Sequence, residues 1–278
     1  MPVFRHSGPT TRLDLAIAQS PLGISRREAK RLLDDARVAV DARIVAAASR
    51  EIPTGAAISI LTGVPEIPLI DLTPELVAID KPSGLPAQPT RERDRISAVE
   101  ILGGQLKRSG EKPDLFVVHR IDSGTSGVLL FARNRAAAAR LSTLFAAHEM
   151  EKVYLALVKG HVEEELLLGK PIARAGAVRF EASEEGRFAE TFLRPMRSSG
   201  GSTLVEIRIS TGRTHQIRVH LSSAGFPIAG DLKYGGATAP RLMLHAWKLA
   251  HPSLGVWTAD PPAELSPALE GPGTRGEG

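Results

Sequence analysis

The chain has 278 residues, of which 42% are hydrophobic and 24% charged, proportions that are typical of a globular protein with one or two domains. The absence of cysteine excludes disulfide bonds, thiolate zinc sites and a cysteine nucleophile, and no apolar run is long enough to predict a transmembrane helix. The excess of 35 Lys and Arg over 31 Asp and Glu suits a polyanion partner such as RNA, but it equally suits an enzyme whose surface is merely basic.

The N-terminal pattern predicts a small domain over residues 11–62. The ten residues before it are expected to form a flexible arm. Apolar residues at helical spacing follow Thr11, and Ser25 with Glu28 has the pattern of a capping box that opens a second helix. That helix is predicted over 26–35, and short strands are predicted over 36–45 and 48–60.

A linker is predicted over 63–70, and a larger domain over 71–256. The patterns in the larger domain predict strands over 76–80, 116–122, 127–133, 151–160, 178–182, 187–195, 202–211 and 242–250, and helices over 96–108, 134–150 and 214–224. Strands and helices do not alternate regularly, so we predict an α+β fold with a large mixed or antiparallel sheet. The segment 259–278, rich in proline and glycine, is expected to be a disordered tail.

The first candidate for chemistry is the segment 116–134, in which His119, Arg120 and Asp122 lie where a strand meets a Gly-containing turn. Polar residues at such an edge are held by a rigid scaffold, which suits an active site, and a nearby cation would keep a carboxylate ionised. The alternative is a structural turn in which Asp122 accepts hydrogen bonds from loop amides. The residues alone leave both interpretations open.

A second cluster follows at the predicted helix over 214–224. Arg213, His215, Gln216, Arg218 and His220 fall within eight residues, and this density of donors favours phosphate or substrate contacts over a solvated basic helix. The two histidines are five residues apart, which is not the spacing of a helical zinc pair, so we expect no metal and no other cofactor.

Two further features would fit an RNA ligand. Tyr154 alternates with apolar neighbours in its predicted strand, so it faces the opposite side of the sheet, where it could stack on a base or simply cover the sheet. In the predicted helix over 26–35, four cations form two pairs with helical spacing, a stripe that phosphate would neutralise but that solvent could also cover. These cations are Arg26, Arg27, Lys30 and Arg31.

Together these segments resemble a known family, the pseudouridine synthases of ribosomal and transfer RNA that carry a His-Arg-Leu-Asp motif. The resemblance lies in HRIDSGTSGVLLFARN, LVAIDKPSGLP, EKVYLALVKG and GRTHQIRVHLSSAGFPIAGDLKYG, in that order. Ile121 replaces the usual leucine of the motif. The N-terminal domain is similar to the S4 RNA-binding domain, although Asp41-Ala42 stands where S4 domains usually have Asn-Gly. The segment 163–189 matches none of the family's motifs.

The resemblance implies an isomerase that converts uridines within RNA, preferably ribosomal RNA, to pseudouridine. It implies that Asp122 is catalytic, either attacking the ribose C1′ or deprotonating C2′, that Tyr154 stacks on the base, and that Arg218 pairs with Asp122. Arg120 would fill the gap left by the flipped uridine, and the donors at Arg213, His215 and Gln216 would contact the RNA. We expect a cytoplasmic monomer. The alternatives are an RNA-binding or ribosome-assembly factor without catalysis, and a hydrolase, for which the sequence shows no nucleophile motif.

Overall fold

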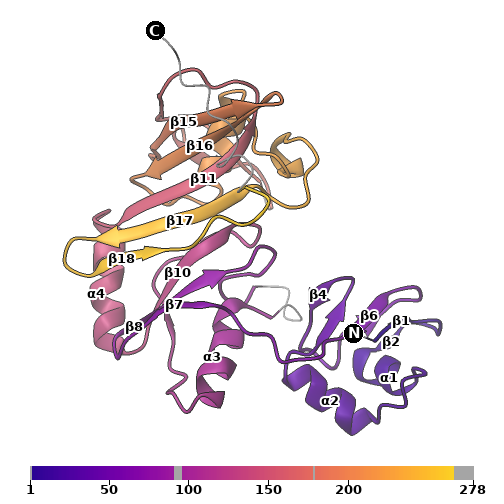
Figure 1. Cartoon of the computed structure of the whole chain (residues 1–278). Helices are drawn as coiled ribbons and strands as arrows, with labels where there is room; N and C mark the ends of the chain where they lie inside the picture. Colours follow the sequence, from indigo (N-terminus) through magenta and orange to yellow (C-terminus); the bar gives the residue numbers. More distant parts are fainter. Residues whose placement is uncertain (1, 91–95, 178, 266–278) are drawn as a thin grey trace. The chain divides into compact units, whose positions relative to one another are not determined.

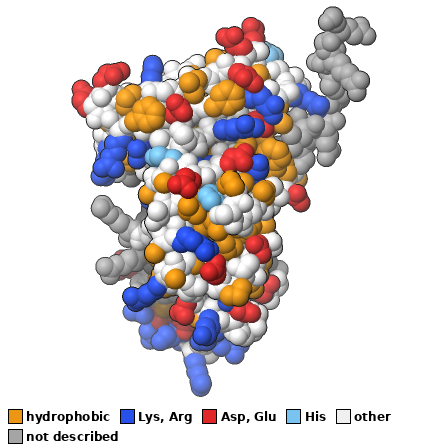
Figure 2. All heavy atoms as spheres, turned by 90° about the vertical axis from the view of Figure 1, so that its left-hand side faces the viewer, with side chains coloured by type: hydrophobic (Ala, Val, Ile, Leu, Met, Phe, Trp, Pro, Cys, Tyr) orange, Lys and Arg blue, Asp and Glu red, His pale blue; other side chains and the backbone are white. Residues whose placement is uncertain are grey.

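The computed structural model describes residues 2–90, 96–177 and 179–265. Within these residues, no helix is long and apolar enough to cross a membrane. The face drawn in Figure 2 shows Lys and Arg side chains interspersed with Asp and Glu side chains over most of its area. Such mixing agrees with the small net charge of +4. The charged segment 91–95 lies outside the described residues.

The chain divides into two compact units, one made of Met1–Pro68 with Gly84–Val117 and the other of Leu69–Ser83 with Val118–Gly278 (Figure 1). The first unit contains a four-stranded sheet in the order β1-β6-β3-β4, a separate strand pair β2-β5, and three helices. Its elements are β1 (Val3–Arg5), β2 (Thr11–Arg12), α1 (Leu13–Ala18), α2 (Arg26–Asp34), β3 (Val38–Val40), β4 (Arg43–Ile44), β5 (Glu51–Ile52), β6 (Ala57–Ile60), α3 (Ala98–Arg108) and β9 (Phe116–Val117).

Local sequence explains most of the first unit. The Ser25 side chain accepts a hydrogen bond from the Glu28 amide at 3.2 Å, so α2 starts where the sequence predicts it. Asp41 and Ala42 turn β3 into β4 with φ angles of 48° and 62°, the left-handed backbone that a tight hairpin needs at both central residues. Asp41 also accepts a hydrogen bond from the Ala57 amide at 3.0 Å, which ties this turn to β6.

The expectation of a flexible N-terminal arm is wrong for part of its length. Strand β1 pairs antiparallel with β6, and Val3 lies opposite Ser59. Three residues are too few to show a strand period, and the partner lies more than fifty residues away in the sequence. The pairing therefore depends on tertiary structure rather than on local pattern.

The second unit is built on one large sheet whose main path runs β12-β15-β16-β11-β17-β10-β8-β7, and β18 pairs with β17 (Figure 1). Along this path the strands are antiparallel except for β10 and β17, which are parallel. The predicted α+β class with a large mixed sheet is confirmed. The strands are β7 (Leu69–Leu72), β8 (Leu76–Lys81), β10 (Ser126–Ala132), β11 (Glu151–Lys159), β12 (Leu166–Leu168), β15 (Thr191–Ser199), β16 (Ser202–Ile209), β17 (Leu244–His251) and β18 (Gly255–Thr258), beside the separate hairpin of β13 (Ile172–Arg174) and β14 (Phe180–Ala182).

Two helices and a short 3-10 turn complete the second unit. Helix α4 (Arg135–Ala146) is capped by Asn134 and packs against β10, whereas α5 (Gln216–Ser223) packs against β14 and β15. The 3-10 turn is η1 (Leu232–Tyr234). Buried apolar side chains of β11, β16 and α5 form the main core, so α5 is fixed against the sheet. This core positions the candidate site, because the helix carries several of its polar residues.

The C-terminal segment differs from the expected disordered tail. The Ala259 amide donates to the Trp247 carbonyl at 3.0 Å, and Leu265 is fully buried in the main core. The high proline content of this segment predicts disorder, and composition does not reveal the two contacts that anchor it. The expectation is therefore wrong for 259–265, and 266–278 lie outside the described residues. The last two residues of the predicted linker, 69 and 70, belong to β7.

Candidate functional site

Asp122 lies in the loop that leads into β10. The predicted strand over 116–122 ends at Val117, and the following residues leave the strand conformation. The Thr125 amide closes the turn by donating to the Asp122 carbonyl at 3.0 Å. Lys81, which is fully buried, donates from Nζ to the Ser123 carbonyl at 3.3 Å, and Ser83 donates to the Gly124 carbonyl at 2.6 Å. These bonds hold the backbone from Asp122 to Thr125, on the C-terminal side of the carboxylate.

One glycine explains why this loop can reach the sheet. Gly127, the second residue of β10, lies opposite Ala246 of the parallel strand β17 and has φ of 107°. A Cβ atom on Gly127 would lie 2.2 Å from the Ala246 carbonyl oxygen, so only glycine allows this close approach. The Gly that follows the Ser-Gly-Thr-Ser turn is therefore a steric requirement of the site's scaffold.

The Asp122 carboxylate is paired with Arg218 from α5. Nη1 of Arg218 donates to Oδ2 of Asp122 at 3.1 Å, and both side chains are largely buried. The other two donating atoms of this guanidinium, Nε and Nη2, grip both oxygens of Asp231 at 2.7 and 2.8 Å. Burial lowers the pKa of Arg218, but the hydrogen bonds and charges of the two carboxylates outweigh it and raise the pKa above its usual value. Arg218 is therefore a permanent cation between two carboxylates.

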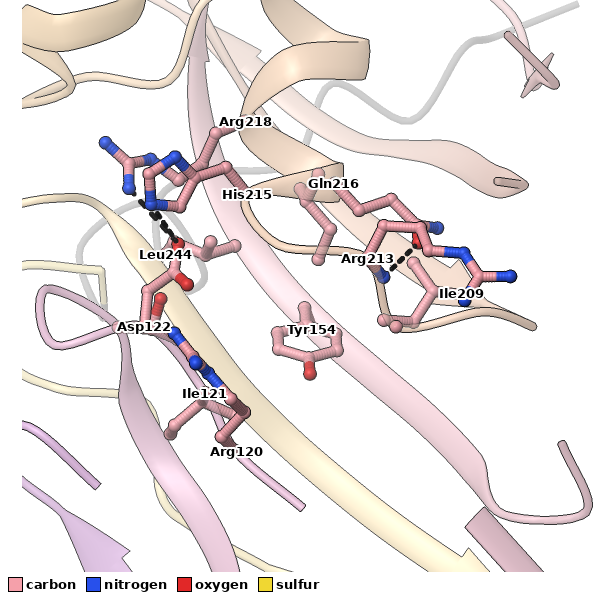
Figure 3. Close-up of a pocket in the computed structure, with 13 residues that line it drawn as sticks. Arg120, Ile121, Asp122, Tyr154, Ile209, Arg213, His215, Gln216, Arg218 and Leu244 are labelled. Carbon is pink, nitrogen blue, oxygen red and sulfur yellow. Dashed lines mark hydrogen bonds and ion pairs between the residues drawn. The ribbon is translucent and has the colours of Figure 1, made fainter. Parts of the chain in front are cut away.

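His215 approaches the same carboxylate oxygen. Its Nε2 lies 3.9 Å from Oδ2 of Asp122, which is too long for a hydrogen bond (Figure 3). Its Nδ1 lies 2.8 Å from the hydroxyl of Tyr234, whose ring also lies against the Arg218 guanidinium at 5.0 Å. Burial lowers the pKa of His215 and the cations nearby lower it further, although the Asp122 charge opposes them.

Tyr154 supplies the aromatic surface of the site. It comes from β11, and its ring lies in the cleft between Asp122 on one side and Arg213 on the other (Figure 3). Burial and the charge of Asp122 raise the pKa of Tyr154, so the phenol is neutral. An uncharged ring beside a carboxylate can stack on a flat base without repelling it.

The cleft is open, and the space within it and at its mouth amounts to about 410 Å³. Seven of the residues predicted for the site line it, namely Arg120, Asp122, Tyr154, Arg213, His215, Gln216 and Arg218. Apolar side chains of Ile121, Ile209, Ile217 and Leu244 fill the spaces between them. Arg120 is exposed at the rim, and the second oxygen of Asp122, Oδ1, accepts no hydrogen bond from the described residues. That oxygen is the free atom of the carboxylate.

Two of the lining residues make hydrogen bonds within the chain. The Gln216 side chain accepts from Thr211 and the Arg213 amide, and donates to the Glu190 carbonyl and Thr191, so all four of its hydrogen-bonding positions are used within the chain. Arg213 donates from Nε to the Phe188 carbonyl at 2.9 Å, and its guanidinium points away from Asp122 (Figure 3). Gln216 is therefore a structural anchor, whereas Arg213 keeps donors for a ligand.

The helix that carries Arg218 begins two residues later than predicted. His215 has φ of 58°, and α5 starts at Gln216 rather than at Thr214. A left-handed residue at this point turns the His215 ring toward Tyr234 and Asp122, a geometry that helical periodicity cannot reveal. His119 of the central motif also differs from expectation. Its Nε2 accepts from the Leu130 amide at 2.9 Å and its ring stacks on Phe145, so it supports the scaffold instead of lining the cleft.

The predicted basic helix is observed as α2 in the first unit. Arg27, Lys30 and Arg31 are exposed. Arg26 is tied to the buried carboxylate of Asp14 through Nε at 2.9 Å, so part of its charge is already neutralised within the chain. Three of the four cations thus remain available to phosphate.

Sequence reasoning missed Asp231 and Tyr234 as members of the site. Both lie in the turn IAGDLKYGG, in which two of the three glycines leave no room for a Cβ. A Cβ on Gly230 would lie 1.8 Å from the Arg241 carbonyl oxygen, and one on Gly236 would lie 1.9 Å from the Ile228 carbonyl oxygen. The sequence does show glycines on both sides of Asp231. Which cation this aspartate would meet was not visible, because α5 and the turn converge only in the folded chain.

The chain matches two family models. The model described as RNA pseudouridylate synthase covers residues 75–223, and the model of the S4 domain covers residues 11–58. A protein named ribosomal large subunit pseudouridine synthase D from Nitrosomonas europaea is 31% identical over 93% of this chain and 83% of its own length. A protein of Chloroflexus aurantiacus, named as an uncharacterized RNA pseudouridine synthase, is 34% identical over 93% of this chain and 89% of its own.

Solved structures agree in fold. Human RNA pseudouridylate synthase domain containing 1 superposes with a TM-score of 0.60 at 26% identity, covering 74% of this chain and 86% of the human chain. Human RNA pseudouridylate synthase domain containing 4 superposes with a TM-score of 0.62 at 24% identity, covering 73% of this chain and 91% of the human chain, and this likeness shows the fold alone.

Proposed function

Because this chain belongs to the RNA pseudouridylate synthase family and carries an S4 domain, we propose that it isomerises uridines of ribosomal RNA, with Asp122 as its catalytic residue. The observation that carries the assignment of Asp122 is the asymmetry of its carboxylate. Oδ2 is held by Arg218, while Oδ1 receives no hydrogen bond from the described residues and lies in the cleft that Tyr154 lines. A fixed, ionised carboxylate with one free oxygen is what a nucleophile or a base requires.

The reaction exchanges one glycosidic bond for another. The bond from C1′ to N1 breaks, the uracil turns and a bond from C1′ to C5 forms. C5 then gives a proton to solvent and N1 takes one up, so the product is an isomer of uridine. Oδ1 of Asp122 either attacks C1′ or removes the proton from C2′, and both routes begin from the same placement of the carboxylate. No electrons are gained or lost overall, so the exchange needs neither an oxidant nor a reductant.

The detached uracil must be kept in place while it turns. We assign this task to Tyr154, whose neutral ring offers a stacking surface on the cleft wall, and to the apolar side chains of Ile209 and Leu244 beside it. A uridine reaches such a cleft only by leaving its stack, at a cost of a few kcal/mol that is least in unpaired RNA. We assign to Arg120, which is exposed and lines the cleft, the task of occupying the space that the uridine vacates.

Ribosomal RNA as substrate is supported by the name of the Nitrosomonas relative and by the S4 domain, in which Arg27, Lys30 and Arg31 of α2 present exposed charge. The test is to map pseudouridines in ribosomal and transfer RNA of a strain that lacks this gene. We expect the loss of one or a few pseudouridines from large-subunit ribosomal RNA, and their return when the gene is restored. Loss from transfer RNA alone would contradict the proposed substrate, and loss from neither would contradict the proposed activity.

A further inference from the structure

The hydroxyl of Tyr234 contacts one ring nitrogen of His215, and this contact bears on which ring nitrogen carries the proton. The Phe180 amide donates to this hydroxyl at 3.1 Å, so the oxygen is already an acceptor on that side. The oxygen has a second lone pair, but among the described residues Nδ1 of His215, at 2.8 Å, is the acceptor within reach of the hydroxyl proton, so we infer that the hydroxyl donates to Nδ1. An imidazole nitrogen that accepts a hydrogen bond carries no proton, so neutral His215 holds its single proton on Nε2.

That Nε2–H group faces Asp122 across a gap. Its nitrogen lies 3.9 Å from Oδ2, which leaves a donor on one side and an acceptor on the other with no bond between them. An oxygen atom could lie about 2.8 Å from both Nε2 and Oδ2, which is an ordinary hydrogen-bond length. The angle at that oxygen between the two hydrogen-bond partners would be roughly 90°, which a hydroxyl allows. A uracil carbonyl oxygen only accepts and would face the carboxylate lone pairs, so the gap selects a group that both accepts and donates.

We propose that the gap between His215 and Asp122 binds the 2′-hydroxyl of the target ribose, and that Tyr234 is the positioning residue that makes His215 a donor there. This inference rests on the proposed function, which brings C1′ and C2′ of the target to Asp122. The 2′-oxygen is bonded to C2′, so it lies within reach of the carboxylate that acts on either carbon. Because the hydroxyl would use Oδ2, Oδ1 stays free for the reaction, and the contact distinguishes RNA from DNA.

The first test needs no RNA. Nitrogen NMR of the full chain labelled at its histidine rings reports which nitrogen of each ring is protonated, and the His215 signals are identified by their loss in His215→Asn. We expect His215 protonated on Nε2 in the wild type, and a mixture of both tautomers in Tyr234→Phe, which removes the hydroxyl but keeps the ring. A wild-type ring protonated on Nδ1 would overturn the proposal.

The second test compares single-turnover rates on one RNA oligonucleotide with either uridine or 2′-deoxyuridine at the mapped target position. His215→Asn removes the donor at the Nε2 position yet suits the left-handed backbone, because asparagine tolerates a positive φ. His215→Gln restores an amide donor at about that reach. His161→Ala, a change at an exposed histidine away from the cleft, is the matched control.

We expect the 2′-deoxy substitution to slow the wild type and His161→Ala by the same factor. It should slow His215→Asn by a factor about ten times smaller, because this variant has already lost the hydrogen bond to the 2′-hydroxyl. Its effect on His215→Gln should be intermediate. An equal 2′-deoxy penalty in the wild type and His215→Asn would overturn the proposal, and would point to a bridging water in the gap if His215→Asn were slow on both substrates. A wild type inactive on all-ribose RNA would instead contradict the proposed function, even where NMR shows the expected tautomer.

Discussion

Asp231 grips Arg218 with both carboxylate oxygens, at 2.7 Å from Nε and 2.8 Å from Nη2, while Asp122 receives a single bond from Nη1 at 3.1 Å. Asp231 is also the more buried carboxylate, with 1% of its side chain exposed against 18% for Asp122. Asp231 therefore fixes the orientation of the arginine, which directs Nη1 to Asp122. Bidentate pairs of this kind fix orientation as well as charge.

Asp231→Asn should slow the isomerisation while leaving RNA affinity unchanged. The substitution leaves Arg218 with a buried charge and a weaker anchor, and breaking a buried pair typically costs about 3–5 kcal/mol. We expect the single-turnover rate to fall at least about tenfold and the melting temperature to drop. The matched control is Glu75→Gln, which removes a carboxylate from an exposed pair with Arg140. Equal effects of the two substitutions would refute a positioning role for Asp231.

Two substitutions of Tyr154 should distinguish the contribution of its ring from that of its hydroxyl. Tyr154→Ala removes the ring from the cleft wall, and the loss of one base-stacking surface costs about 1–3 kcal/mol. We expect Tyr154→Ala to slow single turnover more than Tyr154→Phe does, because phenylalanine keeps the stacking face. The measurement is the rate of tritium release from RNA labelled at C5 of uridine. If both variants were equally impaired, the hydroxyl rather than the ring would be the important group.

His119 should make the protein less stable as the pH falls. Burial and the charge of Lys152 lower the pKa of His119 to about 3, and its neutral Nε2 accepts from the Leu130 amide. The unfolded chain binds this proton near pH 6.5, whereas the folded chain does not. The contribution of neutral His119 to the free energy of unfolding is therefore fully present above pH 6.5 and is lost as the pH falls toward 3. By pH 5 the loss amounts to about 2 kcal/mol.

Urea unfolding at pH 7 and pH 5 measures this loss. His119→Gln keeps an acceptor for the Leu130 amide but cannot titrate, so its free energy of unfolding should change less between the two pH values than that of the wild type. His161→Gln, at an exposed histidine, should keep the wild-type difference. If the free energy of unfolding of His119→Gln changed between pH 7 and pH 5 as much as that of the wild type, other groups would cause the acid sensitivity.

Neutralising the exposed cations of α2 should weaken RNA binding and reduce its salt dependence. The variant Arg27→Gln, Lys30→Gln, Arg31→Gln removes three charges but spares Arg26, whose pair with Asp14 supports the fold. We expect the slope of log affinity against log salt to decrease by about 2, since each phosphate contact contributes roughly 0.7–0.9. The control removes Lys107, Arg108 and Lys112 instead. An unchanged slope in the α2 variant, or the same decrease in the control, would reject a specific phosphate role for α2.

Local patterns predicted most helices and strands, because caps such as Ser25 and apolar periods are written within a few residues of the elements that they define. Local patterns did not predict strand β1 or the ordered segment 259–265, because the partners of both are distant in the sequence. The resemblance to the family joined Asp122 to Arg218 across 96 residues, a pairing that spacing alone could not predict.

The finer parts of the site depended on tertiary structure. Gln216 was predicted to contact substrate because its donors could be counted, but the fold uses all of them internally. Asp231 and Tyr234 were overlooked because a short glycine-bounded turn gives no sign of the helix that it meets. The left-handed backbone of His215, which aims its ring at Asp122, likewise has no signature in helical spacing.

The most direct test of the central claim is tritium release in single turnover from ribosomal RNA labelled at C5 of uridine, comparing the wild type with Asp122→Asn. Asparagine keeps the size and the hydrogen bond to Arg218 but loses the charge that a nucleophile or base needs. With folding verified by an unchanged melting curve and RNA binding retained, we predict release by the wild type and none above background by Asp122→Asn. Release by Asp122→Asn at the wild-type rate would contradict the assignment of Asp122 as the catalytic residue.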